Sequence, residues 1–250
     1  MNVEITGAKI YYVIPGLEIP ITSTVVNTWL VMLLIVAACK WLTHGMHTKG
    51  TSKRQLLAET LVKTTNNWVH NNMGESYVKG DFPSFVGALF SMSVLCSLLS
   101  LFGLYPPTAD FSAMFGWSLM VFVMITATKI KTNKVGGYLK GFTKPIFVLT
   151  PLNIVSELST PLSMAFRHFG NIASGQVVGT LLYAALLVLN KAVFGWVPGI
   201  LGRLLEHFPI TQIGIPAVLS IYFDLFSGFM QAFIFCMLTM NYIKSASETD

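Results

Sequence analysis

Five long stretches of this chain are almost free of charge, and they limit what it can fold into more than any other feature. Each has about twenty or more mostly apolar residues, roughly the number that a helix rising about 1.5 Å per residue needs to cross a hydrocarbon core. We therefore expect an all-α polytopic membrane protein with five membrane-crossing helices. The stretches lie approximately at residues 22–42, 84–104, 111–130, 150–190 and 210–243.

The composition agrees with a membrane protein and argues against a nucleic-acid partner. Hydrophobic residues make up 53% of the chain and charged residues 11%, whereas soluble domains have about 25% charged residues. The net charge is +5, but most lysines and arginines lie in two short segments between apolar stretches, which is a signal of topology. Cys39, Cys96 and Cys236 lack metal-ligand spacing, so we expect no metal site and no cofactor.

The two basic segments predict the orientation of the chain. One follows the first stretch and the other follows the third, so the positive-inside rule puts both in the cytoplasm. Residues 1–21 then form an external N-terminal segment without the features of a secretory signal, and the C-terminus is cytoplasmic. The basic residues are Lys40, Lys49, Lys53 and Arg54, and then Lys129, Lys131, Lys134, Lys140 and Lys144.

Residues 54–72 have the pattern of an amphipathic helix that does not cross the membrane. Leu57, Leu61 and Trp68 fall on one side of such a helix, and Lys63 falls on the other. We expect this helix to lie on the cytoplasmic membrane surface.

The rest of the chain predicts a helical hairpin and two long helices. Residues 84–130 form the hairpin, with the proline-containing segment 105–110 as its turn. The tract 150–190 would be roughly 60 Å long as a helix, about twice the hydrocarbon thickness. It must therefore break or tilt strongly, and we expect two long tilted helices within 150–243.

Two ionisable residues, Arg167 and Asp224, stand inside the last two apolar stretches. A charge at the centre of a bilayer costs roughly 3 kcal/mol or more, so such residues usually serve a function. Gln231 lies seven residues after Asp224, on nearly the same helical face, which predicts a polar seam inside the bundle. Two other interpretations stay open: Arg167 reaches the lipid headgroups, or Arg167 and Asp224 form a buried pair that only joins two helices.

Several segments in order resemble one known family over nearly the whole chain. The stretch from Ser163 to Asn171, SMAFRHFGN, looks like the SLxLRLFGN signature of subunit a of F-type ATP synthases. Also similar are the Pro-Thr-Ala-Asp turn at 107–110, the Gly-Tyr-Leu-Lys-Gly-Phe segment at 137–142, and Gln-Ala-Phe-Ile-Phe at 231–235. The resemblance implies an ion-translocating membrane stator that has no catalytic site of its own.

The resemblance also implies partners and a mechanism. The partners are a ring of c subunits, the peripheral-stalk subunit b, the other ATP synthase subunits and the lipid membrane. Protons pass through two offset half-channels, with Arg167 between them as the stator arginine and Asn171 and Gln231 as polar neighbours. Asp224 takes protons from the outer side, and Gln231, Gln176 and Asp110 support a water chain. Lower-ranked channel-lining candidates are His168, Glu157 and Ser163.

Four positions depart from the family pattern. His168 replaces a leucine, and Ser112 stands where asparagine is frequent. Gln176 stands where some relatives have glutamate, and Asp224 stands where they have histidine, so a carboxylate has changed helices. His168 either titrates near neutral pH or stays neutral in a dry site, and Glu157 either lines the inner exit or lies near the cytoplasmic interface.

A bacterial plasma membrane fits the start of the chain, with an organellar inner membrane as the alternative. The chain contains no GxxxxGK[ST] phosphate loop, so ATP chemistry is not assigned to it by that motif. Two other functional classes stay open from the residues alone, a secondary ion or solute transporter and a purely structural membrane anchor.

Overall fold

The computed structural model describes residues 7–16, 18–46, 52–143, 146–194 and 218–248. It is mostly helical, and five of its helices are long and apolar enough to cross a membrane, which confirms the predicted fold class. Residues 210–217 of the predicted last stretch lie outside the described residues. The five candidate spans are Ser23–Thr43, Phe82–Phe102, Phe111–Gly141, Phe147–Val193 and Val218–Ser247.

The elements follow one another in a simple order. A two-stranded hairpin precedes the helices, short 3-10 turns join several of them, and a π-helix precedes the last one. The bounds are β1 (Ile10–Ile14), β2 (Ile19–Thr22), α1 (Ser23–Thr43), α2 (Lys53–Met73), α3 (Glu75–Val78), α4 (Phe82–Leu98), η1 (Leu99–Phe102), η2 (Pro107–Ala109), α5 (Phe111–Gly141), η3 (Phe147–Leu149), α6 (Thr150–Phe194), η4 (Ile221–Phe226) and α9 (Ser227–Ser247).

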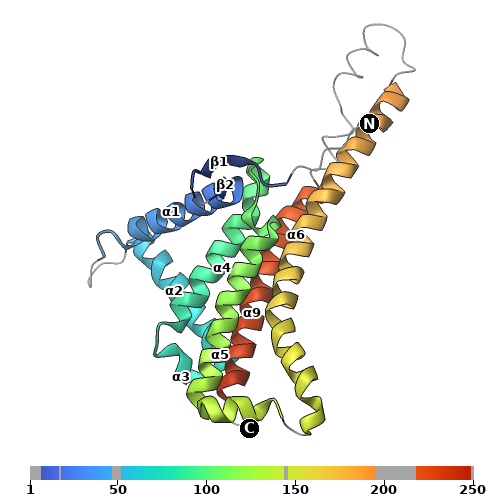
Figure 1. Ribbon diagram of the computed structural model, residues 1–250. Coiled ribbons are helices and arrows are strands. Elements are labelled where there is room, and N and C mark those ends of the chain that lie inside the picture. Colours follow the sequence, from blue (N-terminus) through green and yellow to red (C-terminus); the bar gives the residue numbers. More distant parts are fainter. Residues whose placement is uncertain (1–6, 17, 47–51, 144–145, 195–217, 249–250) are drawn as a thin grey trace.

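Helices α4, α5 and α9 run side by side, and α6 passes along α5 and α9 and continues beyond them (Figure 1). Val86, Val121 and Met240, which come from α4, α5 and α9, are fully buried in one core. Helix α1 joins this bundle at α4, where Val31 packs against Cys96. Most other large apolar side chains remain exposed, as expected for helices that face lipid.

Helix α2 packs against the bundle instead of extending away from it. Its Val69 is fully buried, and the ring of Trp68 stacks on Phe233 of α9 with centroids 5.3 Å apart. Ser52 caps the helix by accepting a hydrogen bond from the Gln55 backbone nitrogen at 3.2 Å. The position of α2 at the membrane surface stays a prediction.

The N-terminal hairpin departs from an all-α expectation. Strands β1 and β2 pair antiparallel, from Ile10 opposite Thr22 to Ile14 opposite Ile19. A search for helical periodicity does not reveal the backbone of the turn between the strands. Gly16 has a φ of 99° and Glu18 a φ of 51°, and such positive φ values are common for glycine and rare for other residues.

Two further differences concern helix ends. The basic segment after the third stretch is largely helical: α5 continues into it as far as Gly141, with a break at Lys134, whose φ is 58° and ψ 165°. Helix α6 has 45 residues with Pro161 inside it, hence roughly 67 Å, so the tract stays one helix. Its tilt in a membrane stays a prediction.

Gly228 allows α4 and α9 to approach closely, and this contact generates a stability prediction. A Cβ atom at Gly228 would lie 2.9 Å from the Ser97 Cβ atom. We expect Gly228→Ala to lower the free energy of unfolding by about 1–3 kcal/mol through overpacking, measured by SDS titration of the detergent-solubilised subunit.

The matched control is Gly116→Ala in α5, where an added Cβ meets no described atom within 4 Å. That change should be neutral or stabilising, because alanine suits a helix better than glycine. Ser97→Gly should recover part of the loss in a double-mutant cycle. Equal behaviour of Gly228→Ala and Gly116→Ala would contradict the close contact.

Candidate functional site

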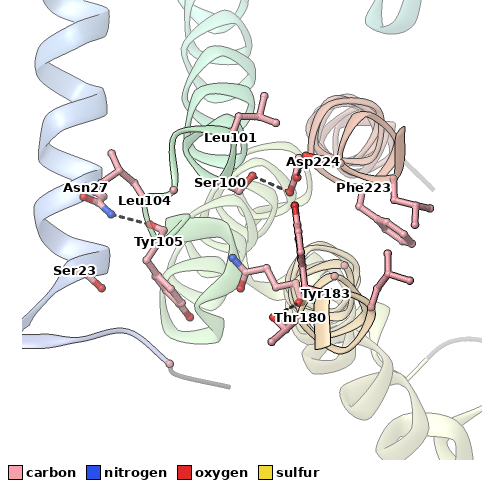
Figure 2. Close-up of a pocket in the computed structure, with 18 of the residues that line it drawn as sticks. Ser23, Asn27, Ser100, Leu101, Leu104, Tyr105, Thr180, Tyr183, Phe223 and Asp224 are labelled. Atoms are coloured by element: carbon pink, nitrogen blue, oxygen red, sulfur yellow. Dashed lines mark hydrogen bonds between the residues drawn. The ribbon is translucent and has the colours of Figure 1, made fainter. Parts of the chain in front are cut away.

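Asp224 lies in η4, a π-helical turn at the start of the last span. Such turns in otherwise α-helical segments often occur at functional sites. Two hydroxyl groups hold its carboxylate: Ser100 Oγ donates a hydrogen bond to Oδ1 at 2.9 Å, and Ser220 Oγ donates to Oδ2. Figure 2 shows Ser100 and Asp224 facing one another across the gap between the α4–α5 turn and η4. The aspartate is therefore oriented within the bundle.

Asp224 lines a cavity of about 730 Å³. Gln176 of α6 lines the same cavity, so the structure brings together two of the predicted site residues. The Tyr183 side chain, also from α6, extends toward Asp224 (Figure 2). Other polar residues of the wall are Lys9, Tyr11, Ser23, Asn27, Ser100, Tyr105, Thr180 and Ser220. This mixture of hydroxyls, amides and one carboxylate can hold a chain of water molecules.

Hydrogen bonds from α1 fix the turn that forms one wall of the cavity. Asn27 Nδ2 donates to the Tyr105 carbonyl oxygen at 2.8 Å. Thr24 Oγ1 donates to Asp110 Oδ2 at 2.7 Å, and Asp110 Oδ1 accepts from the Ser112 backbone nitrogen at 3.0 Å, which caps α5. Asp110 is thus a structural acceptor beside the cavity and is not among the residues that line it.

Tyr105 lies in the same turn. Its burial, and then the negative charge of Asp110, raise the pKa of the Tyr105 phenol. The phenol therefore stays protonated at neutral pH and donates its hydrogen to the Ala109 carbonyl oxygen at 3.0 Å.

Arg167 has a different environment from Asp224. Its side chain is exposed on α6, and within the described parts of the chain no hydrogen bond or ion pair engages it. Among those residues the ion pairs are Lys79–Glu75 and Lys129–Glu157. The alternative of a buried Arg167–Asp224 pair is therefore wrong for this chain, because the carboxylate is bound by serines and the guanidinium points outward.

His168, the next residue, points into the bundle. It is 1% exposed, its Nε2 lies 3.4 Å from Ser93 Oγ, and its ring packs edge-on against Phe235 with centroids 5.7 Å apart. Its Nδ1 has no hydrogen-bond partner among the described residues. Because consecutive helical residues are about 100° apart, burying His168 turns Arg167 toward the outer surface.

Asn171 and Gln231 lie between α6 and α9. Asn171 Oδ1 accepts a hydrogen bond from Ser227 Oγ at 2.8 Å, and Gln231 is 7% exposed. A Cβ atom at Gly175 would lie 3.3 Å from the Phe223 side chain, so α6 and η4 approach closely at the wall of the cavity, which both residues line. These polar side chains belong to the helix interface beside Arg167, and neither Asn171 nor Gln231 lines the cavity.

The other sequence candidates lie toward the beginning of α6. Glu157 accepts hydrogen bonds from Lys129 Nζ at 2.7 Å through both carboxylate oxygens, which ties α6 to α5. Ser163 is exposed one turn before Arg167. Along the helix, Arg167 therefore follows Glu157 by roughly 15 Å and precedes Gln176 by roughly 13 Å.

Some site residues were missed from the sequence. Ser220 was detectable, because it stands four residues before Asp224 and so on the same helical face. Ser100 was not, since it is 124 positions away from the aspartate it binds. In the part of the chain that the structure describes, no group of three histidine, cysteine, aspartate or glutamate side chains could hold a metal ion.

Comparison with known proteins agrees with this arrangement. The family described as ATP synthase A chain matches residues 25–244. The sodium-ion-specific ATP synthase subunit a of Propionigenium modestum is 28% identical over 91% of this chain and 74% of its own. ATP synthase subunit a of Desulforamulus reducens is 31% identical over 96% of this chain and 85% of its own length. ATP synthase subunit a 1 of Crocosphaera subtropica is 30% identical over 91% of this chain and 87% of its own length.

The family model matches most of the chain, and the structure has five candidate membrane spans. These findings argue against the two alternatives, a stand-alone transporter and a purely structural anchor. The chain belongs to the ATP synthase A chain family: it is an ion-translocating subunit a of ATP synthase, a multi-pass membrane stator without a catalytic site of its own.

Proposed function

We propose that this chain conducts protons between a rotating ring of c subunits and the two sides of a bacterial cell membrane. Two half-channels, offset across the membrane, reach the ring, and Arg167 separates them. The observation that carries the proposal is the separation on α6 between Arg167, which is exposed and has no partner among the described residues, and the polar cavity at Gln176 and Asp224. A single continuous pore would need no such separation.

The cavity at Asp224 is the outer half-channel in this proposal. The Asp224 carboxylate accepts two hydrogen bonds from hydroxyl groups, and it also borders a space large enough for several water molecules. A carboxylate in such a place accepts a proton from water and passes it on, as general acids and bases do. Gln176 extends the polar wall, and Asn171 and Gln231 lie on the way to Arg167.

Arg167 controls release of the ion from the ring. A guanidinium keeps its charge at any relevant pH, and an opposite charge stabilises the ionised form of a carboxylate next to it. Because Arg167 is exposed on α6, it is available to a rotor carboxylate that passes this face. The ring site therefore loses its ion beside Arg167 and is reloaded only after rotation, which blocks a direct leak.

The inner half-channel lies toward the beginning of α6 in this proposal. Ser163 is exposed on nearly the same side of α6 as Arg167, and it offers a hydroxyl below the arginine. Glu157 is held by Lys129, so its first role is to keep α5 and α6 together at the exit. The c ring covers the Arg167 side of α6, and subunit b contacts another part of the chain.

Protons are the proposed ion, and sodium is the alternative. The relative from Propionigenium modestum is named as sodium-ion specific, which favours testing sodium directly. In this family the chain provides access to the ring, and the ring carboxylate that binds the ion belongs to another subunit.

Loss of Arg167 should uncouple the enzyme. At about 4 Å and an effective dielectric constant of about 20, the charge contributes about 4 kcal/mol to a neighbouring carboxylate. We therefore expect Arg167→Ala to reduce ATP-driven pumping by inverted vesicles to background while the attached head still hydrolyses ATP. A pH-sensitive dye and ²²Na⁺ uptake, recorded in parallel, identify the ion.

The matched control for Arg167→Ala is Lys191→Ala, which removes an exposed positive charge from the same helix. It should pump like the wild type. Wild-type pumping by an assembled Arg167→Ala complex would refute the proposed role of the arginine. If the wild-type enzyme takes up ²²Na⁺ without a change in the pH-sensitive dye, the transported ion is sodium and not the proton.

Substitutions of Asp224 and of Asp110 should have very different effects on ATP-driven pumping. Asp224→Asn keeps the shape but removes the proton acceptor, so pumping should fall by at least about tenfold. Asp110→Asn keeps one oxygen that can still accept from the Ser112 backbone nitrogen and cap α5, and its amide nitrogen can donate to Thr24 Oγ1 in place of the present bond, so pumping should stay within about twofold of wild type. The same vesicle assay measures both, and equal losses would contradict the assignment of Asp224 to the ion path.

The proposed topology has an external N-terminus and a cytoplasmic C-terminus. Cys39 is the exposed native cysteine among the described residues, so Cys39→Ala provides the background. Tyr12→Cys should react with a membrane-impermeant maleimide from outside intact cells, and Glu248→Cys only in inverted vesicles. The reverse pattern would overturn the positive-inside assignment.

A further inference from the structure

We infer that the N-terminal hairpin forms the mouth of the cavity at Asp224 and that Lys9 sets, through its positive charge, how readily cations enter it. This inference rests on the proposed function of the cavity as the outer half-channel. It adds a residue that controls ion access and lies far in sequence from the residues of the ion path.

The hairpin segment is part of the cavity wall. Gly7, Lys9 and Tyr11 line the cavity together with Ser23 and Asn27 of α1. Lys9 is exposed, whereas Asp224 is partly buried. A cation that enters from the hairpin side therefore meets Lys9 before it meets the carboxylate.

Backbone hydrogen bonds hold Lys9 in place. Its backbone nitrogen donates to Ser23 Oγ at 3.1 Å, and its carbonyl oxygen accepts from the Ser23 backbone nitrogen at 2.8 Å. Because neither bond uses the lysine side chain, a substitution at position 9 changes the charge and leaves this attachment intact.

Helix α1 connects the hairpin rigidly to the opposite wall. Thr24 binds Asp110 at 2.7 Å, and Asn27 binds the Tyr105 carbonyl oxygen at 2.8 Å. The hairpin, the first turns of α1 and the α4–α5 turn therefore form one hydrogen-bonded frame around the cavity. The side chain of Lys9 projects from this frame and not from a free chain end.

Few of the described residues that line the cavity are charged. Among the described lining residues, Lys9 and Asp224 are the charged ones. The other titratable groups of the wall are the phenols of Tyr11, Tyr105 and Tyr183, and Asp110 lies behind the wall, bound to Thr24. A cation at the mouth of a cavity lowers the local concentration of other cations there.

Reversing this charge should make entry easier. Lys9→Glu replaces repulsion of cations by attraction, and we expect the local cation concentration at the mouth to rise by about threefold to tenfold at low ionic strength. For protons, a threefold to tenfold change corresponds to about 0.5–1 pH unit. The half-maximal rate of ATP synthesis should therefore occur at a higher external pH.

The experiment uses the whole ATP synthase in proteoliposomes energised by an acid–base transition. The rate of ATP synthesis is measured against the pH on the side that holds the hairpin, at about 10 mM and about 1 M salt. The shift caused by Lys9→Glu should be present at low salt and absent at high salt, where the Debye length is about 3 Å. Lys9→Gln should give about half the shift.

Lys191→Glu is the matched control, since Lys191 is exposed near the same end of α6 as the cavity but does not line it. It should leave the midpoint unchanged. If sodium drives synthesis, the same Lys9 variant should lower the half-maximal sodium concentration threefold to tenfold.

The outcomes separate this inference from the proposed function. Suppose that Arg167→Ala abolishes ATP synthesis and that Lys9→Glu leaves the pH midpoint unchanged at low salt. This pair of results overturns the role of Lys9 and leaves the proposed ion path standing. A shift that persists at 1 M salt, or equals that of Lys191→Glu, also overturns it. Synthesis that survives Arg167→Ala refutes the proposed function itself.

Discussion

The structure depends on how polar groups are satisfied in a bundle that is mostly apolar. A carboxylate in such surroundings is costly unless hydrogen bonds compensate for the lost water. Asp224 meets this condition through Ser100 and Ser220, which ties η4 to the end of α4. Arg167 is exposed instead, with no partner in the described chain. The proposed function depends on this asymmetry, because an arginine already paired inside the stator could not respond to a passing carboxylate.

The length of α6 sets the distances between the functional groups. Since α6 is one helix, Glu157, Arg167 and Gln176 lie at three successive levels about 13–15 Å apart. His168 fixes the rotation of this helix by packing between Ser93 and Phe235. A rigid helix with a buried side chain beside the arginine therefore determines both the height and the direction of the charge that faces outward.

Much of the fold follows from the sequence because the bilayer restricts it to helices of a minimum length. The same cost of burying charge marked Arg167 and Asp224 as functional candidates. Contacts between distant segments did not follow, since no local pattern pairs Ser100 with Asp224 or Gly228 with Ser97. The hairpin escaped because its two strands are short and its backbone includes left-handed residues.

Two of the four departures from the family pattern, Gln176 and Asp224, have a physical account in the structure. Gln176 and Asp224 come from different helices, yet both line one cavity. Water in that cavity meets a carboxylate whether it is carried by α6 or by η4, so the chemistry depends on the contents of the cavity more than on the helix that supplies them. The serines suit the present arrangement: Ser220 stands one turn before Asp224, and Ser100 faces it across the cavity wall. A carboxylate at position 176 would have neither bond as they are now arranged, so the two serines favour a carboxylate at position 224 over one at position 176.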